Sequence, residues 1–155
     1  MVGGITLTHT YSFSLFVACT EIAISLNKLG NLYYESGDLQ SALTCYHQGL
    51  EVEMAVLEPG NFNVCVTLTN IAEIHKQRLQ YDKALENYHK VLDLQRRHKA
   101  NPLEIASTLS SIGFVKHQKG DYPGALTVNQ ECLHIRREIN GDIDSDVAAS
   151  MTHSK

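Results

Sequence analysis

The stretch LNKLGNLYYESGDLQSALTCY, residues 26–46, decides the fold. Apolar residues recur at steps of three or four over residues 22–33 and again over 39–50, which indicates two helices with one buried face each. The tripeptide SGD at 36–38 separates them. Glycine suits the left-handed turn that ends a helix, and aspartate or a nearby serine can cap the next one. The stretch therefore predicts a helix-turn-helix hairpin.

The same hairpin pattern returns along the chain. Equivalent positions lie 42, 41 and 42 residues apart. The series that share this spacing are Ile22, Val64, Ile105 and Val147 at the start of the first helices, Leu26, Leu68, Leu109 and Met151 one turn later, and Ala42, Ala84 and Ala125 in the second helices. A fixed period of this size is typical of an array of identical helical units. We therefore expect an all-α chain built from stacked hairpins.

The predicted units follow from the turn signals between them. We expect repeat 1 at residues 20–61, repeat 2 at 62–101 and repeat 3 at 102–142, with 143–155 beginning a truncated fourth repeat. Pro and Gly together close the first unit, and an Asn-Pro pair opens the third in the way that helices often begin. The third unit is expected to end at the Asn-Gly-Asp tripeptide 140–142. Two interpretations remain open: the chain is a fragment of a longer parent, or its two ends act as the caps that repeat arrays require.

The N-terminal segment 1–19 needs its own interpretation. Its apolar part, ITLTHTYSFSLFVAC at 5–19, is shorter than the roughly 20 apolar residues that span a bilayer. No lysine or arginine precedes Lys28, so the positive start of a secretory signal is missing. Two glycines and a β-branched run make it a poor helix. We expect a local apolar segment that packs against the first helices.

Composition places the 155-residue chain among globular proteins. Apolar residues make up 43% and charged residues 19%, and the net charge is -4. A negative chain has no electrostatic reason to bind nucleic acid. The four cysteines form no CxxC pair, which favours a reducing compartment, the cytoplasm. We expect neither nucleic acid nor a membrane among the partners.

Catalytic and metal-binding patterns are missing from the sequence. It contains no phosphate loop, no G-x-S-x-G and no H-E-x-x-H, so we expect no enzyme and no cofactor. Cys45 and His47, like Cys132 and His134, are two apart, a spacing that points helical side chains to opposite sides and cannot form a zinc site. The acidic run 142–146 lacks the later glycine and glutamate of an EF-hand loop. We expect no metal site.

The units resemble the tetratricopeptide family. That family's pattern is a Leu-Gly pair, an aromatic residue three positions on, and an alanine followed four positions later by an aromatic residue. The first unit has Leu29-Gly30, Tyr33, Ala42 and Tyr46, the second has Ile71-Ala72, His75, Ala84 and Tyr88, and the third has Ile112-Gly113, Lys116, Ala125 and Asn129. The period near 42 is similar to that of kinesin light chains, whereas the common repeat has about 34 residues. HEAT repeats share the longer period but not the small-residue pattern.

The resemblance implies a right-handed α-α superhelical solenoid with a concave groove lined by the first helices. Candidate groove residues are the polar and aromatic residues of the first helices that lie outside the apolar stripe. They are Asn27, Asn31, Tyr34, Asn70, Glu73, Lys76, Gln77, Ser110, Phe114 and His117. Asparagine suits this task because its amide pairs with a peptide backbone of any sequence. Each residue also fits a solvated surface position, so the set is a hypothesis.

The resemblance further implies a non-catalytic module that binds a peptide segment of a partner protein. A kinesin-light-chain-like cargo adaptor would bind cargo or a kinesin heavy chain through a longer parent protein. Relatives that grip a C-terminal carboxylate use a Lys/Asn/Arg cluster, of which only Asn31 and Asn70 are matched here. The alternative is an internal regulatory or structural segment of a larger enzyme or signalling protein.

Overall fold

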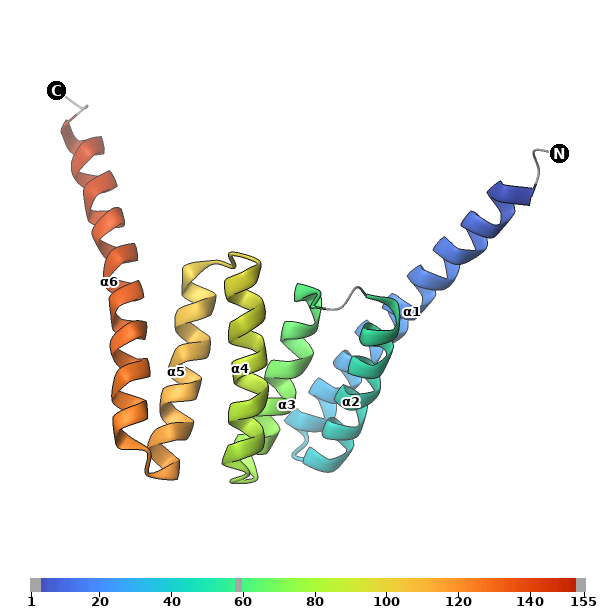
Figure 1. The fold of residues 1–155 in the computed structure, drawn as a ribbon, viewed down its shortest axis with the longest axis horizontal. Coiled ribbons are helices and arrows are strands. Elements are labelled where there is room, and N and C mark those ends of the chain that lie inside the picture. The colour runs from blue at the N-terminus through green and yellow to red at the C-terminus, as the bar shows by residue number, and fades with distance from the viewer. Residues whose placement is uncertain (1–3, 58–59, 153–155) are drawn as a thin grey trace. The chain divides into compact units, whose positions relative to one another are not determined.

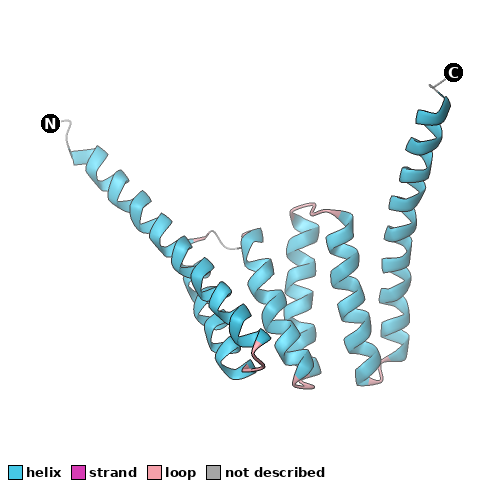
Figure 2. Ribbon diagram, turned by 180° about the vertical axis from the view of Figure 1, so that it is seen from behind, coloured by secondary structure: helices cyan, strands magenta, loops and turns pink. Residues whose placement is uncertain are grey.

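The computed structural model describes the backbone of residues 4–57 and 60–152, and side chains within 14–141. These residues form the long helices α1 (Gly4–Glu35), α2 (Leu39–Val56), α3 (Cys65–Gln77), α4 (Tyr81–Arg97), α5 (Pro102–Lys119) and α6 (Tyr122–Thr152), with a short 3-10 turn, η1 (Phe62–Val64), before α3. No strand occurs in the described ranges (Figure 2). The predicted all-α class with helix-turn-helix repeats is confirmed.

The chain divides into two compact units, Met1–Ile74 and His75–Lys155. In the first unit, α1 and α2 lie side by side (Figure 1). Its core joins Ala42 and Tyr46 of α2 to Ile71 and Ile74 of α3, all at most 2% exposed. These are apolar-stripe positions of the hairpin, and their burial supplies the main driving force for packing.

In the second unit, α4, α5 and α6 lie in sequence order, with α5 packed against both neighbours (Figure 1). Its core includes Val91 of α4 together with Leu109, Ile112 and Val115 of α5, each at most 1% exposed. Side chains of α5 are therefore buried on two sides, which explains why so many of its positions are apolar or small.

The helix breaks lie where the turn residues predict them. Gly37 has a φ of 84° after α1, and Gly120 has a φ of 87° after α5. Asp38 Oδ1 accepts a hydrogen bond of 3.0 Å from the backbone N–H of Ser41 at the start of α2. At the start of α5, Asn101 Oδ1 accepts a hydrogen bond of 2.9 Å from the backbone N–H of Leu103. Leu79 takes the left-handed conformation between α3 and α4 without the help of glycine, with a φ of 57°.

The small positions of the repeat have a direct packing reason. A Cβ atom on Gly30 of α1 would lie 2.6 Å from Cε1 of Tyr46, and one on Gly113 of α5 would collide with the amide of Asn129. The aromatic or amide side chain of the second helix therefore lies over a bare backbone. Asn129, which departs from the family pattern, takes the place in repeat 3 that Tyr46 has in repeat 1.

Both ends of the chain differ from the expectation. Residues 5–19 are not a separate poor helix former but the first half of α1. The predicted stop at 140–142 is also absent, because α6 continues to Thr152. Extending an existing helix adds one hydrogen bond per residue without a new nucleation cost. That gain outweighs the weak propensities of β-branched residues and of one glycine. The repeat boundaries themselves stay predictions.

Candidate functional site

Three helices of the first unit enclose a pocket of about 280 Å³. Its lining residues are Asn31, Tyr34 and Glu35 of α1, Tyr46 of α2, and Asn70 and Glu73 of α3. We call it the Asn31–Asn70 pocket. Four of the ten predicted groove residues meet here. Sequence reasoning missed Glu35 and assigned Tyr46 to the core alone, although the phenol of Tyr46 reaches the pocket.

Two asparagine amides in this pocket are linked to each other. Asn31 Oδ1 accepts a hydrogen bond of 2.6 Å from the hydroxyl of Tyr46 and a longer one of 3.4 Å from Nδ2 of Asn70. Among the described residues, the Nδ2 group of Asn31 and the Oδ1 atom of Asn70 have no protein partner. The pair thus offers one donor side and one acceptor side to a guest, which are the two groups that a peptide backbone requires.

The charge of the Asn31–Asn70 pocket is negative. Its lining includes the acidic residues Glu35 and Glu73 and contains no lysine or arginine. Burial, followed by the carboxylate of Glu73, raises the pKa of Tyr34. Burial also raises the pKa of Tyr46, with smaller contributions that include Tyr34 and Glu35. Both phenols therefore stay protonated at neutral pH, and the pocket presents hydroxyl groups and carboxylates.

Asn27 belongs to a different cluster, inside the first unit. Its Nδ2 group donates to Thr67 Oγ1 at 2.7 Å and to Glu53 Oε1 at 3.2 Å, and Thr67 donates to the same carboxylate oxygen at 3.1 Å. The cluster connects α1, α2 and α3. Because these interactions occupy its Nδ2 group, Asn27 is a structural residue and not part of the Asn31–Asn70 pocket.

Glu53 is the unexpected member of that cluster. Burial raises its pKa, and the hydrogen bonds from Thr67 and Asn27 oppose the rise. Within the described residues, Glu53 Oε2 and Asn27 Oδ1 are buried without a hydrogen-bond partner. No local sequence signal marks this carboxylate, because Glu53 is one of two similar glutamates in the peptide EVEM, 51–54.

The remaining predicted residues, from Lys76 onward, lie in the second unit. Lys76 Nζ lies 5.7 Å from the centroid of the Phe114 ring, a cation–π distance. His117 contacts Tyr122 edge to face, with ring centroids 5.4 Å apart. Gln77, Ser110 and Phe114 are exposed, Phe114 by 51%. Within this set, the structure shows one contact, that between Lys76 and Phe114.

Within the described residues, no three histidine, cysteine or acidic side chains converge as metal ligands. Among the described residues, Cys19, Cys45, Cys65 and Cys132 form no disulfide. No helix in the described ranges combines the length and hydropathy of a bilayer span.

The repeated hairpins of the chain match a known family. Two family models, both described as "Tetratricopeptide repeat", match residues 21–97 and 105–146. The chain belongs to the tetratricopeptide repeat family. The matched residues contain the helix breaks at Gly37 and Gly120 and the close contacts over Gly30 and Gly113 described above.

Among relatives in the tetratricopeptide family, the chain is similar to Protein KINESIN LIGHT CHAIN-RELATED 1 of Arabidopsis thaliana. The two are 30% identical over 100 residues, which make up 64% of this chain and 16% of the relative. The matched region is thus 16% of the length of that relative. The resemblance to kinesin light chains is therefore confirmed at the level of the repeats.

Solved structures show the same fold. BtubC (BKLC) from P. vanneervenii has a TM-score of 0.72 at 19% identity, covering 77% of this chain and 48% of that one. The first tetratricopeptide domain of Spaghetti (RPAP3), bound to the HSP90 peptide SRMEEVD, has a TM-score of 0.60 at 18% identity, covering 85% of this chain and 95% of that one. Identities this low support the fold alone.

Proposed function

We propose that the chain is a non-catalytic interaction module that binds an extended peptide segment of a partner protein in the Asn31–Asn70 pocket. The observation that carries the proposal is the pair of amides with one unused donor side and one unused acceptor side in a pocket between three helices. Such a pair can bind the backbone of a guest whatever its sequence. The domain of RPAP3 with the same fold is itself bound to a peptide.

The charge of the pocket sets the class of peptide. Glu35 and Glu73 attract a lysine or arginine side chain of the guest and repel an acidic one. The peptide bound to RPAP3, SRMEEVD, is acidic at its C-terminal end. The Asn31–Asn70 pocket has no basic residue to receive such an end. We therefore propose a basic segment as the ligand.

The second unit, taken by itself, has an exposed contact surface of its own. Phe114 is half exposed and the ammonium group of Lys76 lies over its ring, so the pair can hold an apolar side chain of the guest. Gln77, Ser110 and His117 are exposed polar residues of the same unit. The similarity to a kinesin light chain-related protein supports a cytoplasmic cargo adaptor, with cargo or a kinesin heavy chain bound through a longer parent protein.

A peptide array tests the proposal. Basic, neutral and acidic peptides are presented to the wild-type chain and to the double variant Asn31→Ala, Asn70→Ala. Loss of two hydrogen bonds of about 1 kcal/mol each weakens binding of basic peptides by about 10- to 30-fold. Asn140→Ala, an exposed asparagine on α6, is the matched control and leaves binding unchanged. Binding that survives the double substitution contradicts the assignment of this pocket.

A further inference from the structure

The side chains of Asn27, Glu53 and Thr67, which we call the Asn27 cluster, lie next to the Asn31–Asn70 pocket along the same helices. Asn27 and Asn31 are four residues apart on α1, and Thr67 and Asn70 are three residues apart on α3. Residues at these spacings lie one helical turn apart on one face of a helix. Asn27 donates to Thr67 at 2.7 Å, and Asn70 donates to Asn31 at 3.4 Å. Two successive polar contacts therefore join α1 to α3, and the second belongs to the pocket.

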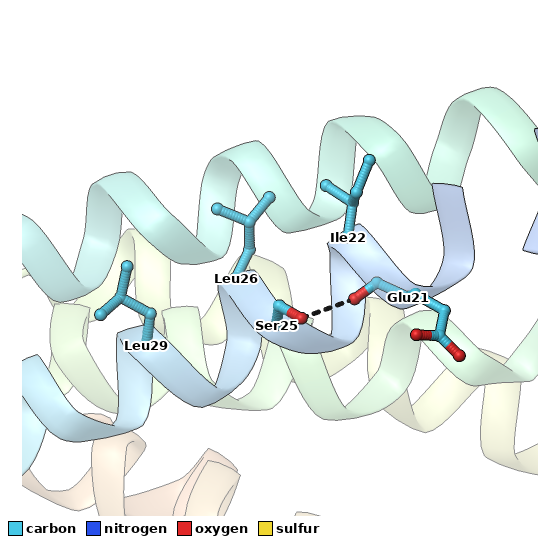
Figure 3. A pocket seen from close by; sticks show the side chains of 5 residues that line it. All are labelled: Glu21, Ile22, Ser25, Leu26 and Leu29. Carbon is cyan, nitrogen blue, oxygen red and sulfur yellow. Dashed lines mark hydrogen bonds between the residues drawn. The ribbon is translucent and has the colours of Figure 1, made fainter. Parts of the chain in front are cut away.

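Both asparagines of α1 lie away from its apolar side. Figure 3 shows Ile22, Leu26 and Leu29 with their side chains projecting from one side of this helix. Each residue of an α-helix is turned by about 100° from the one before, which places Asn27 and Asn31 on another side. There, each of the two asparagines contacts both α2 and α3. One polar side of α1 therefore serves the cluster and the pocket together.

The Asn27 cluster contains two buried acceptors that lack a donor. Within the described residues, Glu53 Oε2 and Asn27 Oδ1 have no hydrogen-bond partner. Glu53 Oε1, by contrast, accepts from Asn27 at 3.2 Å and from Thr67 at 3.1 Å. A proton on Glu53 Oε2 turns that oxygen into a donor, and Asn27 Oδ1 is an acceptor without a donor in the same cluster. The acid form of Glu53 therefore supplies the donor that the cluster lacks.

The surroundings of Glu53 favour its acid form. The groups that act on it from the neighbouring helices are Thr67 of α3 and Asn27 of α1, and neither of them titrates. Burial is the largest cause of its raised pKa, and among the described residues no charged side chain of α1, α2 or α3 contributes. As the pH rises through this pKa, the cluster acquires a negative charge with one buried oxygen unsatisfied. Such a group costs free energy until water or another donor reaches it.

Ionisation of Glu53 is transmitted to the pocket through α1 and α3. Water reaches the buried oxygen of Glu53 when the contacts around it lengthen, that between Asn27 and Thr67 included. The next contact along these helices, from Asn70 to Asn31, is 3.4 Å long, which is close to the limit of a hydrogen bond. A small further separation of the helices breaks it. The two amides then no longer present their donor and acceptor sides at a fixed spacing.

We propose that Glu53 is a positioning residue of the Asn31–Asn70 pocket, whose acid form ties α1, α2 and α3 together one helical turn away and whose ionisation weakens binding of the guest peptide. This regulation rests on the proposed function, because it acts on the peptide site described above. Three hydrogen bonds within the Asn27 cluster connect the three helices that line the pocket. The module therefore holds its peptide more tightly when Glu53 is protonated.

Peptide affinity measured across the pH range tests this role. A basic peptide selected on the array is titrated, by fluorescence anisotropy, into the wild-type chain and into Glu53→Gln, from pH 4.5, the ordinary pKa of glutamate, to neutral pH. Glutamine resembles the acid form because its amide has a donor beside an acceptor. At neutral pH we expect Glu53→Gln to bind about three- to tenfold more tightly than the wild type, the effect of keeping about one hydrogen bond. This difference should disappear at low pH, where Glu53 is protonated.

The matched control is Glu51→Gln. Glu51 is an exposed glutamate two residues before Glu53 on α2, so its substitution makes the same change in net charge outside the cluster. We expect this variant to follow the wild-type pH profile. The carboxylates of Glu35 and Glu73 in the pocket are common to all three proteins, so the difference between the profiles isolates Glu53.

Each outcome decides the role of Glu53. Equal binding by Glu53→Gln and the wild type at every pH overturns it. Weaker binding by Glu53→Gln at neutral pH overturns it too, because the ionised carboxylate would then be the form that orders the pocket. Loss of structure does not raise affinity, so the expected gain at neutral pH excludes unfolding as its cause.

Failure of the proposed function gives a different result. In that case no peptide binds to either protein at any pH, and the side-chain amide NMR signals of Asn31 and Asn70 in the free chain decide the role of Glu53. A titration that these signals follow in the wild type and that is missing from Glu53→Gln supports the role. Identical pH profiles of the signals in both proteins overturn it.

Discussion

Gly30→Ala is a direct test of how the first hairpin packs. Glycine inside a helix costs about 1 kcal/mol relative to alanine, so on propensity alone the substitution would stabilise α1 by about that amount. The structure predicts the opposite sign. A Cβ atom at this position lies 2.6 Å from Cε1, 2.8 Å from Cδ1 and 3.0 Å from Cζ of Tyr46. Carbon atoms prefer separations of about 3.5–4.0 Å.

The ring of Tyr46 has little room to move away. It is 2% exposed, packs against Ala42, Ile71 and Ile74, and donates a hydrogen bond of 2.6 Å to Asn31. Overpacking of this kind costs about 1–3 kcal/mol, and losing the hydrogen bond adds about 1 kcal/mol. After subtracting the gain in helix propensity, we expect Gly30→Ala to lower the free energy of unfolding by about 1–3 kcal/mol.

The assay is urea denaturation followed by circular dichroism, with Gly141→Ala as the matched control. Gly141 also lies inside a helix, but nothing lies within 4 Å of its Cβ position. That variant should therefore gain about 1 kcal/mol. A double variant, Gly30→Ala with Tyr46→Leu, should show a smaller effect of the alanine, because the ring is gone. If Gly30→Ala stabilised the chain as much as Gly141→Ala does, Tyr46 would not occupy the space over Gly30, and the reasoning would be refuted.

Three further predictions concern single positions. Burial raises the pKa of Glu53 above its ordinary 4.5, so the folded chain holds this proton more tightly than the unfolded chain. Stability should therefore fall as the pH rises from 4.5 through the folded-state pKa, and Glu53→Gln should remove that slope in denaturation curves taken across the pH range. Gly37→Ala forces a side chain into a φ of 84° and should cost about 1–2 kcal/mol in urea denaturation. Ala84 is 0% exposed, so Ala84→Leu should lower the melting temperature through overpacking of about 1–3 kcal/mol, and an unchanged melt would contradict its tight packing.

Much of the hairpin architecture could be predicted from local signals. The turns at Gly37 and Gly120 and the cap at Asp38 lie where the sequence indicates, because each depends on the conformational preference of one residue or on a bond to a residue three positions away. The helix limits near the two ends of the chain could not be predicted from the sequence. Residues 5–19 and 140–142 carry weak or contrary propensities, and a helix already nucleated next to them extends through both.

The candidate site was only partly predictable. Asn27, Asn31 and Asn70 look alike in sequence, yet Asn27 binds Glu53 and Thr67 in the interior while the other two line a pocket. A shift of one helical turn changes which neighbour an amide meets. Glu53 is likewise indistinguishable from solvated glutamates until α1 and α3 are placed against α2.

By itself, the sequence determined the helices, most of their ends, the repeat period and the family, since these depend on interactions within a few residues and on spacing along the chain. Only the tertiary structure decided which polar groups are buried, which amides keep unused hydrogen-bonding sides, and which apolar faces stay bare. Those properties depend on which helices are neighbours in space. The same apolar stripe in the sequence is covered by neighbouring helices on α5 and is exposed on α1.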